Sequence, residues 1–198
     1  MSAPPSISYA AGMKAPGLLV VDMVNDFLQS WATASPQRLV QSTNGLVATL
    51  RKHDRPVIWV RQEFRPDLRD AFSEMRQREY ASRSKETPGC QIAADLAVAP
   101  ADTVIIKKRY SAFYGTCLDH VLGGLKVDGL ILAGINTHAC IRMTAIDAYQ
   151  RDWEVIVAAD CIDSYDRERH EISLRYMNGK IACVMNNVEI RAMLARAK

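Results

Sequence analysis

The sequence lacks the features that mark membrane, secreted or nucleic-acid-binding proteins. No apolar run approaches the ~18 residues of a membrane-spanning helix. The N-terminus has no basic region followed by an apolar core, so no secretory signal is expected. The 25 basic and 22 acidic residues leave a formal net charge of only +3, too small to indicate a nucleic-acid or membrane partner. We therefore expect a cytoplasmic protein that binds neither nucleic acid nor a membrane.

Paired cysteines are also missing. An odd number of dispersed cysteines with no C-x-x-C pair argues against a disulfide framework and against a structural zinc site. We expect reduced thiols and no structural metal. The five cysteines are Cys90, Cys117, Cys140, Cys161 and Cys183.

The length and composition indicate one globular domain. The chain has 198 residues, of which 48% are hydrophobic and 24% charged, enough for a single full core. Pro4 and Pro5 lie in a segment without apolar periodicity, so residues 1–15 are expected to form a flexible arm and residues 16–198 the domain.

Short apolar runs alternate with helical patterns along the domain. This alternation predicts βαβ units, and hence an α/β fold: a doubly wound sheet of about six mainly parallel strands with helices on both faces. Ligands of such sheets bind at the carboxyl ends of the strands. The expected strands are 17–23, 56–62, 102–108, 128–135, 154–160 and 180–186, and the expected helices are 36–53, 67–79, 115–125, 138–151, 167–178 and 187–197.

Cys140 follows the expected strand 128–135 and would lie in the first turn of the helix 138–151. The positive end of the helix dipole and the unpaired backbone N–H groups there favour a thiolate, which is the nucleophilic form of cysteine. A free cysteine is also among the most commonly buried residues and often only fills space. Position alone leaves both readings of Cys140 open.

Two other strand ends carry charged residues. Asp22 ends the first strand and is either a cap or a general base. Lys107 and Lys108 end the third strand and must point to opposite faces, so one lysine faces the site and the other does not. Each lysine could equally extend its ammonium group into solvent. Together, an acid, a base and a thiol at one sheet edge can attack an acyl carbon.

Three segments carry a family resemblance that covers nearly the whole chain. The segments "LLVVDMVNDF", "IIKKRYSAFYGTCLDHVL" and "LILAGINTHACIRMTAIDAYQRDWEVIVAADC" resemble the isochorismatase-like cysteine hydrolases, in the same order. Carried over, the resemblance makes Asp22 the base and Cys140 the nucleophile. It matches the family lysine to Lys107, with Lys108 as the second choice. Among members of this family, the motifs are most similar in pattern to those of N-carbamoylsarcosine amidase and ureidoacrylate amidohydrolase.

The resemblance also implies details of the site and the reaction. It places a cis peptide bond between Ile135 and Asn136 and forms an oxyanion hole from the backbone N–H groups of Asn136 and Cys140. It implies hydrolysis of a C–N bond in a small amide, ureido or carbamoyl substrate through a cysteine thioester, without a cofactor. It further implies a homodimer or homotetramer.

Four side chains are candidate substrate contacts. Phe27 and Phe113 adjoin the site motifs. Arg142 could bind a substrate carboxylate, or instead pack at a subunit boundary or pair with an aspartate. His138 could face the pocket or solvent.

Nicotinamidases of the same superfamily bind a metal through an Asp-x-His motif and a later histidine. The corresponding stretch here, "WVRQEFRPDLRDAF", holds no histidine, so we expect no catalytic metal.

Two other functions remain as alternatives. One is isochorismatase-type hydrolysis of a vinyl ether, which needs no thiol nucleophile. The other is a catalytically silent oligomeric module, which would have no reason to retain Asp22, Lys107 and Cys140 together.

Overall fold

The computed structural model describes residues 13–30, 36–77 and 87–196. The strands are β1 (Pro16–Val21), β2 (Val57–Gln62), β3 (Thr103–Lys107), β4 (Gly129–Ile135), β5 (Glu154–Asp163) and β6 (Cys183–Met185). The α-helices are α1 (Asn25–Ser30), α2 (Pro36–Lys52), α3 (Ser73–Gln77), α4 (Leu118–Leu125), α5 (Arg142–Tyr149), α6 (Arg167–Met177) and α7 (Asn187–Arg196). A 3-10 turn, η2 (Pro88–Cys90), and a π-helical segment, η3 (Thr137–Ile141), complete the described elements.

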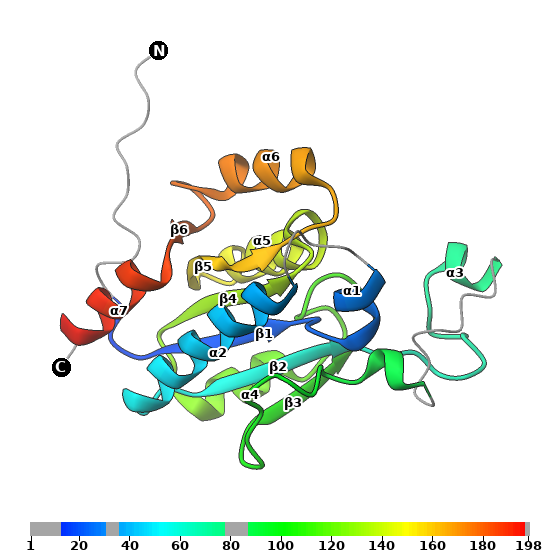
Figure 1. Cartoon of the computed structure of the whole chain (residues 1–198), viewed down its shortest axis with the longest axis horizontal. Coiled ribbons are helices and arrows are strands. Elements are labelled where there is room, and N and C mark those ends of the chain that lie inside the picture. The colour runs from blue at the N-terminus through cyan, green and yellow to red at the C-terminus, as the bar shows by residue number, and fades with distance from the viewer. Residues whose placement is uncertain (1–12, 31–35, 78–86, 197–198) are drawn as a thin grey trace.

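The strands form one sheet in the order β3-β2-β1-β4-β5-β6, with every pairing parallel (Figure 1). The chain starts in the middle with β1, runs outward to β3, and then returns to β4 on the other side of β1. The strand order therefore reverses between β1 and β4, where ligands of open α/β sheets bind. This confirms the predicted fold class.

Helices cover both faces of the sheet, and a hydrophobic core lies under each layer. We call the side packed by α1, α2 and α7 the α2 face, and the side packed by α4, α5 and α6 the α5 face. On α2, apolar residues recur every three or four positions, so Leu46 and Leu50 point into the core and are fully buried. Leu118 and Leu122 do the same from α4. Because both faces are covered, β1 and β4 are buried along their whole length.

The helix expected over 67–79 is wrong in its first half. Only Ser73–Gln77 is helical, and residues 78–86 lie outside the described part of the chain. Leu68 has a left-handed φ of 55°, which an α-helix does not allow. The carboxylate of Asp67 accepts from the backbone N–H of Arg69, at 3.2 Å, and so stabilises a turn in place of a helix. The short helix α1 has no counterpart among the sequence expectations.

The expected N-terminal arm, residues 1–15, lies outside the described residues except for its end. Met13 is buried, and the backbone N–H groups of Lys14 and Ala15 donate to the Asp128 carboxylate at 2.7 and 2.9 Å. Residues 13–15 are therefore fixed to the domain. Among the helices of the described ranges, none combines the length and apolar character needed to cross a membrane.

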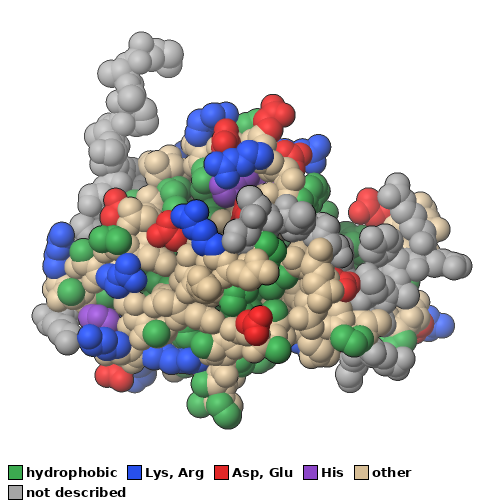
Figure 2. Space-filling view, viewed as in Figure 1, with side chains coloured by type: hydrophobic (Ala, Val, Ile, Leu, Met, Phe, Trp, Pro, Cys, Tyr) green, Lys and Arg blue, Asp and Glu red, His purple; other side chains and the backbone are tan. Residues whose placement is uncertain are grey.

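Charge is distributed without a strong patch on the face seen in Figure 2. Basic and acidic side chains alternate there, and in the part not covered by grey atoms neither sign forms a continuous surface. This agrees with the small net charge of +3.

Candidate active site at the carboxyl edge of the sheet

Three reactive side chains from different elements meet at the carboxyl edge of the sheet. The Lys107 Nζ lies 2.6 Å from Asp22 Oδ2 and donates to Cys140 Sγ at 3.5 Å. Asp22 and Lys107 are fully buried, and Cys140 is 4% exposed. The fold thus brings a carboxylate, an ammonium and a thiol into one desolvated cluster, which we call the Asp-Lys-Cys cluster.

The Asp22 carboxylate is fixed by the end of β1 and by the neighbouring strand. Asp22 adopts a left-handed φ of 56°, a conformation that aspartate tolerates better than most residues. Its Oδ1 accepts the backbone N–H of Gln62 at 2.8 Å, which leaves Oδ2 for Lys107. Sequence patterns could not reveal this backbone donor, because it depends on how β1 and β2 align.

The two strand-end lysines point in different directions, as expected. The Lys108 Nζ pairs with the Asp70 carboxylate at 3.0 Å and also donates to the backbone carbonyl of Glu63. The Lys107 Nζ instead donates to the Arg109 carbonyl at 2.9 Å, in addition to its contacts within the cluster. The structure therefore brings Lys107, and not Lys108, to Asp22 and Cys140.

Cys140 occupies a different local structure from the one expected. The helix expected over 138–151 consists of η3 followed by α5, and Cys140 lies in the π-helical segment rather than in the first turn of an α-helix. The Ile135–Asn136 peptide bond that precedes this segment is cis. Gly134, with a φ of 119°, allows the close approach of β1, because a Cβ there would overlap the Val21 carbonyl oxygen.

The electrostatics favour a protonated thiol, contrary to the thiolate expected from a helix start. Burial raises the pKa of Cys140 to about 12; the Lys107 ammonium opposes this shift and the Asp22 carboxylate adds to it. Burial disfavours the Lys107 ammonium, but its pairing with the Asp22 carboxylate and its contact with Cys140 outweigh burial and raise the pKa of Lys107. The resting cluster is therefore a carboxylate–ammonium pair beside a neutral thiol, and the thiol needs a base.

These shifts predict that the protein loses stability above about pH 9. The ordinary thiol pKa is 9.0, whereas the pKa of Cys140 in the folded protein is about 12. Between these values the folded state binds more protons than the unfolded state, so raising the pH favours unfolding, by at most about 1.4 kcal/mol per pH unit. The raised pKa of Lys107 acts in the same direction, above its ordinary value of 10.5.

The measurement is urea unfolding between about pH 8 and pH 11 for the wild type and for Cys140→Ala. The variant lacks the cysteine contribution, so its free energy of unfolding should fall less steeply with pH. Parallel profiles for the two proteins would contradict the raised thiol pKa.

The two phenylalanines proposed as substrate contacts lie in different cores. Phe113 is 3% exposed and packs in the α5-face core that also holds Cys140, with the Arg151 guanidinium 4.6 Å from its ring centre. Phe27 is 2% exposed and packs in the α2-face core. Of these two residues, only Phe113 shares a core with the Cys140 thiol.

The structure directs His138 toward the connection between β5 and α6, and Arg142 toward α6. The His138 Nδ1 bonds to Ser164 Oγ, and the Arg142 guanidinium lies 4.3 Å from the ring centre of Tyr176. Each of these two residues is two positions from Cys140, so on a helical backbone each projects from the side opposite the thiol. The structure therefore does not bring these two candidate contacts to the thiol.

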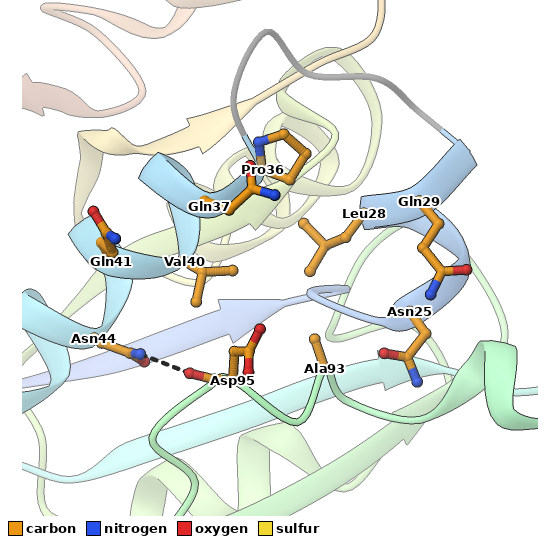
Figure 3. A pocket seen from close by; sticks show the side chains of 10 residues that line it. All are labelled: Asn25, Leu28, Gln29, Pro36, Gln37, Val40, Gln41, Asn44, Ala93 and Asp95. Atoms are coloured by element: carbon orange, nitrogen blue, oxygen red, sulfur yellow. Dashed lines mark hydrogen bonds between the residues drawn. The ribbon is translucent and has the colours of Figure 1, made fainter.

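A hollow lies elsewhere, between α1 and α2 (Figure 3). Its volume is about 520 Å³, and none of the Asp-Lys-Cys cluster residues lines it. Half of its ten lining residues carry side-chain amides, and Asn44 Nδ2 donates to the Asp95 carbonyl at 2.8 Å. Over residues 13–30, 36–77 and 87–196, no group of three or more His, Cys, Asp or Glu side chains is arranged to hold a metal ion.

Comparison with known proteins gives a consistent result. The family model "Isochorismatase domain" matches residues 16–188, which is most of the chain. The chain is 30% identical over 166 residues to the uncharacterized isochorismatase family protein YaaI of Bacillus subtilis, covering 81% of this chain and 87% of that protein.

Solved structures agree with this match. A cysteine hydrolase from Pseudomonas syringae pv. phaseolicola superposes with a TM-score of 0.86 at 25% identity, covering 100% of both chains. The N-carbamoylsarcosine amidase from Thermoplasma acidophilum superposes with a TM-score of 0.74 at 30% identity, covering 87% of this chain and 96% of the other.

Proposed function

Because the chain belongs to the isochorismatase-like hydrolase family, we propose that it hydrolyses a C–N bond of a small amide, ureido or carbamoyl compound through a thioester on Cys140. The observation that carries this proposal is the cluster itself: Lys107 Nζ contacts both Asp22 Oδ2, at 2.6 Å, and Cys140 Sγ, at 3.5 Å. The similarity to an N-carbamoylsarcosine amidase supports the choice of a C–N bond. We further propose that the protein acts as a homodimer or homotetramer.

In the first half of the reaction, Cys140 attacks the substrate carbonyl carbon. A thiol with a pKa of about 12 is not ionised in advance, so Asp22 takes the proton as the C–S bond forms. The Lys107 ammonium stabilises the negative charge on sulfur. The backbone N–H groups of Asn136 and Cys140 hold the oxyanion. Asp22 then donates its proton to the leaving nitrogen as the C–N bond breaks, which releases ammonia or an amine and leaves a thioester.

In the second half, water replaces the leaving amine. Asp22, again a carboxylate, takes a proton from the water as its oxygen adds to the thioester carbon. The same two N–H groups hold the second oxyanion. When the C–S bond breaks, the sulfur takes the proton back from Asp22, and the acid product leaves. One carboxylate thus serves as base and acid twice, with Lys107 holding it in place.

The cluster favours this chemistry over its alternatives. A covalent acyl intermediate needs a nucleophile, and a buried thiol beside a carboxylate meets that need. Hydrolysis of a vinyl ether needs protonation of the substrate and no thiol. Among the candidate substrate contacts, Phe113 is best placed, because its ring packs in the core that holds Cys140.

The test is a panel of small compounds assayed for ammonia release, with acid-quenched samples examined by mass spectrometry. The panel holds N-carbamoyl amino acids, ureidoacrylate, biuret, nicotinamide and aliphatic amides, with isochorismate assayed in parallel for ether cleavage. We expect ammonia release from at least one compound and its acyl group on the Cys140 peptide. Turnover of isochorismate with no ammonia from any amide would overturn the proposal.

A further inference from the structure

The turn that carries Cys140 is tied to α6 by a buried side chain that the proposed reaction does not use. His170, on α6, bonds through Nδ1 to the hydroxyl of Thr137 at 2.9 Å. Thr137 is the first residue of η3 and lies three positions before Cys140. Its hydroxyl also donates to the Asp163 carbonyl, at the end of β5, at 3.1 Å. Thr137 is fully buried and His170 is 7% exposed.

The chemistry of a hydroxyl fixes the direction of these bonds. Thr137 has one hydroxyl proton, and the Asp163 carbonyl can only accept it. The hydroxyl must therefore accept from His170, which places a proton on Nδ1. Burial, and then the nearby Arg167, lower the pKa of His170 and favour its neutral form. Since Nδ1 carries a proton in both the neutral and the charged form, the bond to Thr137 survives a change of pH.

A second hydrogen bond ties η3 to the connection between β5 and α6. His138 Nδ1 bonds to Ser164 Oγ, and the backbone N–H of Ser164 donates to the Asp163 side chain at 2.7 Å. Two consecutive residues of η3 are thus tied to the connection between β5 and α6. The thiol lies at the other end of η3, in contact with Lys107.

We propose that Thr137 and His170 are positioning residues, which hold the η3 turn closed so that Cys140 Sγ stays against Lys107 and out of solvent. The effect on turnover rests on the proposed function, whereas the effect on thiol exposure does not. Loss of the buried bond leaves an unpaired polar group, which the turn relieves by opening locally. Opening moves the sulfur away from Asp22 and Lys107, so protection and catalysis are lost together.

The test is alkylation of the full-length protein by iodoacetamide at about pH 9, with each cysteine followed by mass spectrometry. Thr137→Val and His170→Leu remove the bond. Thr137→Ser keeps the hydroxyl, and His170→Asn keeps a donor near the position of Nδ1. The matched control is Ser173→Ala, since Ser173 is buried on the same side of α6 and its hydroxyl has no hydrogen-bond partner among the described residues.

Two other cysteines in each sample act as internal references. Cys117 is exposed and reports the rate of an accessible thiol. Cys161 is fully buried in the α2-face core, so we expect it to react only when the domain unfolds as a whole. We expect Cys140 alkylation to rise about tenfold relative to Cys161 in Thr137→Val and His170→Leu, and to return toward wild type in Thr137→Ser and His170→Asn.

With a substrate from the panel, the same two variants should lose about tenfold in kcat while KM changes less than about twofold. The inference is overturned if Cys140 and Cys161 become reactive together, if neither becomes more reactive, or if Ser173→Ala matches the bond-deleting variants. If no compound in the panel is hydrolysed, the proposed function fails, and the alkylation rates still decide whether the bond holds the turn.

Discussion

Cys140→Ala should abolish hydrolysis of any substrate that the panel identifies, with kcat falling by about 10⁴-fold or more. Without sulfur there is no atom to form the thioester, and the remaining Asp22 and Lys107 can only bind water in its place. Cys140→Ser is expected to be similarly inactive, because a buried hydroxyl is a much weaker acid than a thiol and Asp22 cannot deprotonate it efficiently. The measurement is steady-state ammonia release by the purified proteins.

The matched control for this experiment is Cys161→Ala. Cys161 is another buried cysteine, and burial raises its pKa to about 11, but its Sγ bonds to Asn187 on the other side of the sheet. Its replacement should leave kcat within about twofold of wild type. An active Cys140→Ala protein, or equal losses in both variants, would contradict the nucleophile assignment.

Lys107→Met is expected to destabilise the fold by about 3–5 kcal/mol and to inactivate the enzyme. Lys107 and Asp22 are both fully buried, and their pairing at 2.6 Å compensates for the lost hydration of each charge. Removing the ammonium leaves the Asp22 carboxylate buried beside an apolar side chain. Activity should be lost as well, because in the proposed mechanism Asp22 accepts the thiol proton, and without Lys107 it is no longer held in place. Urea unfolding near neutral pH measures the change in stability.

Lys108→Met supplies the control, since Lys108 is the next residue and its side chain is 34% exposed in its pair with Asp70. Its loss should cost less than about 1 kcal/mol. The double variant Asp22→Asn with Lys107→Met removes both charges and should be more stable than Lys107→Met alone. If the two lysine variants unfold at the same urea concentration, the buried ion pair does not make the predicted contribution to the free energy of unfolding.

The sheet could be predicted well because its strands are buried on both sides. Residues 17–23 and 128–135 are nearly continuous apolar runs, and the structure has β1 and β4 within them. Parallel strands with covered faces leave this pattern in any local context. The meeting of Asp22 with the third strand's lysine follows from the same logic, since carboxyl ends of parallel strands share one edge.

Finer features depend on contacts that a linear pattern does not contain. Alternation shows only that Lys107 and Lys108 diverge. The family resemblance favoured Lys107, and the structure pairs Lys107 with Gln62 of the neighbouring strand. The π-helical segment around Cys140 has only five residues, too few for a periodic pattern to predict it. The direction of the thiol pKa shift depends on burial, which the sequence pattern does not show.

The hydrogen bonds that hold the η3 turn could not be predicted from the sequence either. Thr137 and His170 are separated by 33 residues and belong to different elements. Each has an unremarkable sequence context, and only the packing of α6 against η3 joins them. Arg142 was expected as a possible carboxylate ligand, yet its position on the helix turns it toward Tyr176.

The burial and the raised pKa of Cys140 also affect its sensitivity to oxidants. Peroxide attacks thiolates, and a sulfur that keeps its proton and is 4% exposed offers little of the susceptible form. We therefore expect the Cys140 thiol to react slowly with most electrophiles at rest. In the proposed mechanism, the reactive sulfur forms only when a substrate carbonyl lies against Asp22 and the two backbone N–H groups. We therefore expect the burial that makes a base necessary in the proposed mechanism also to slow irreversible oxidation of Cys140.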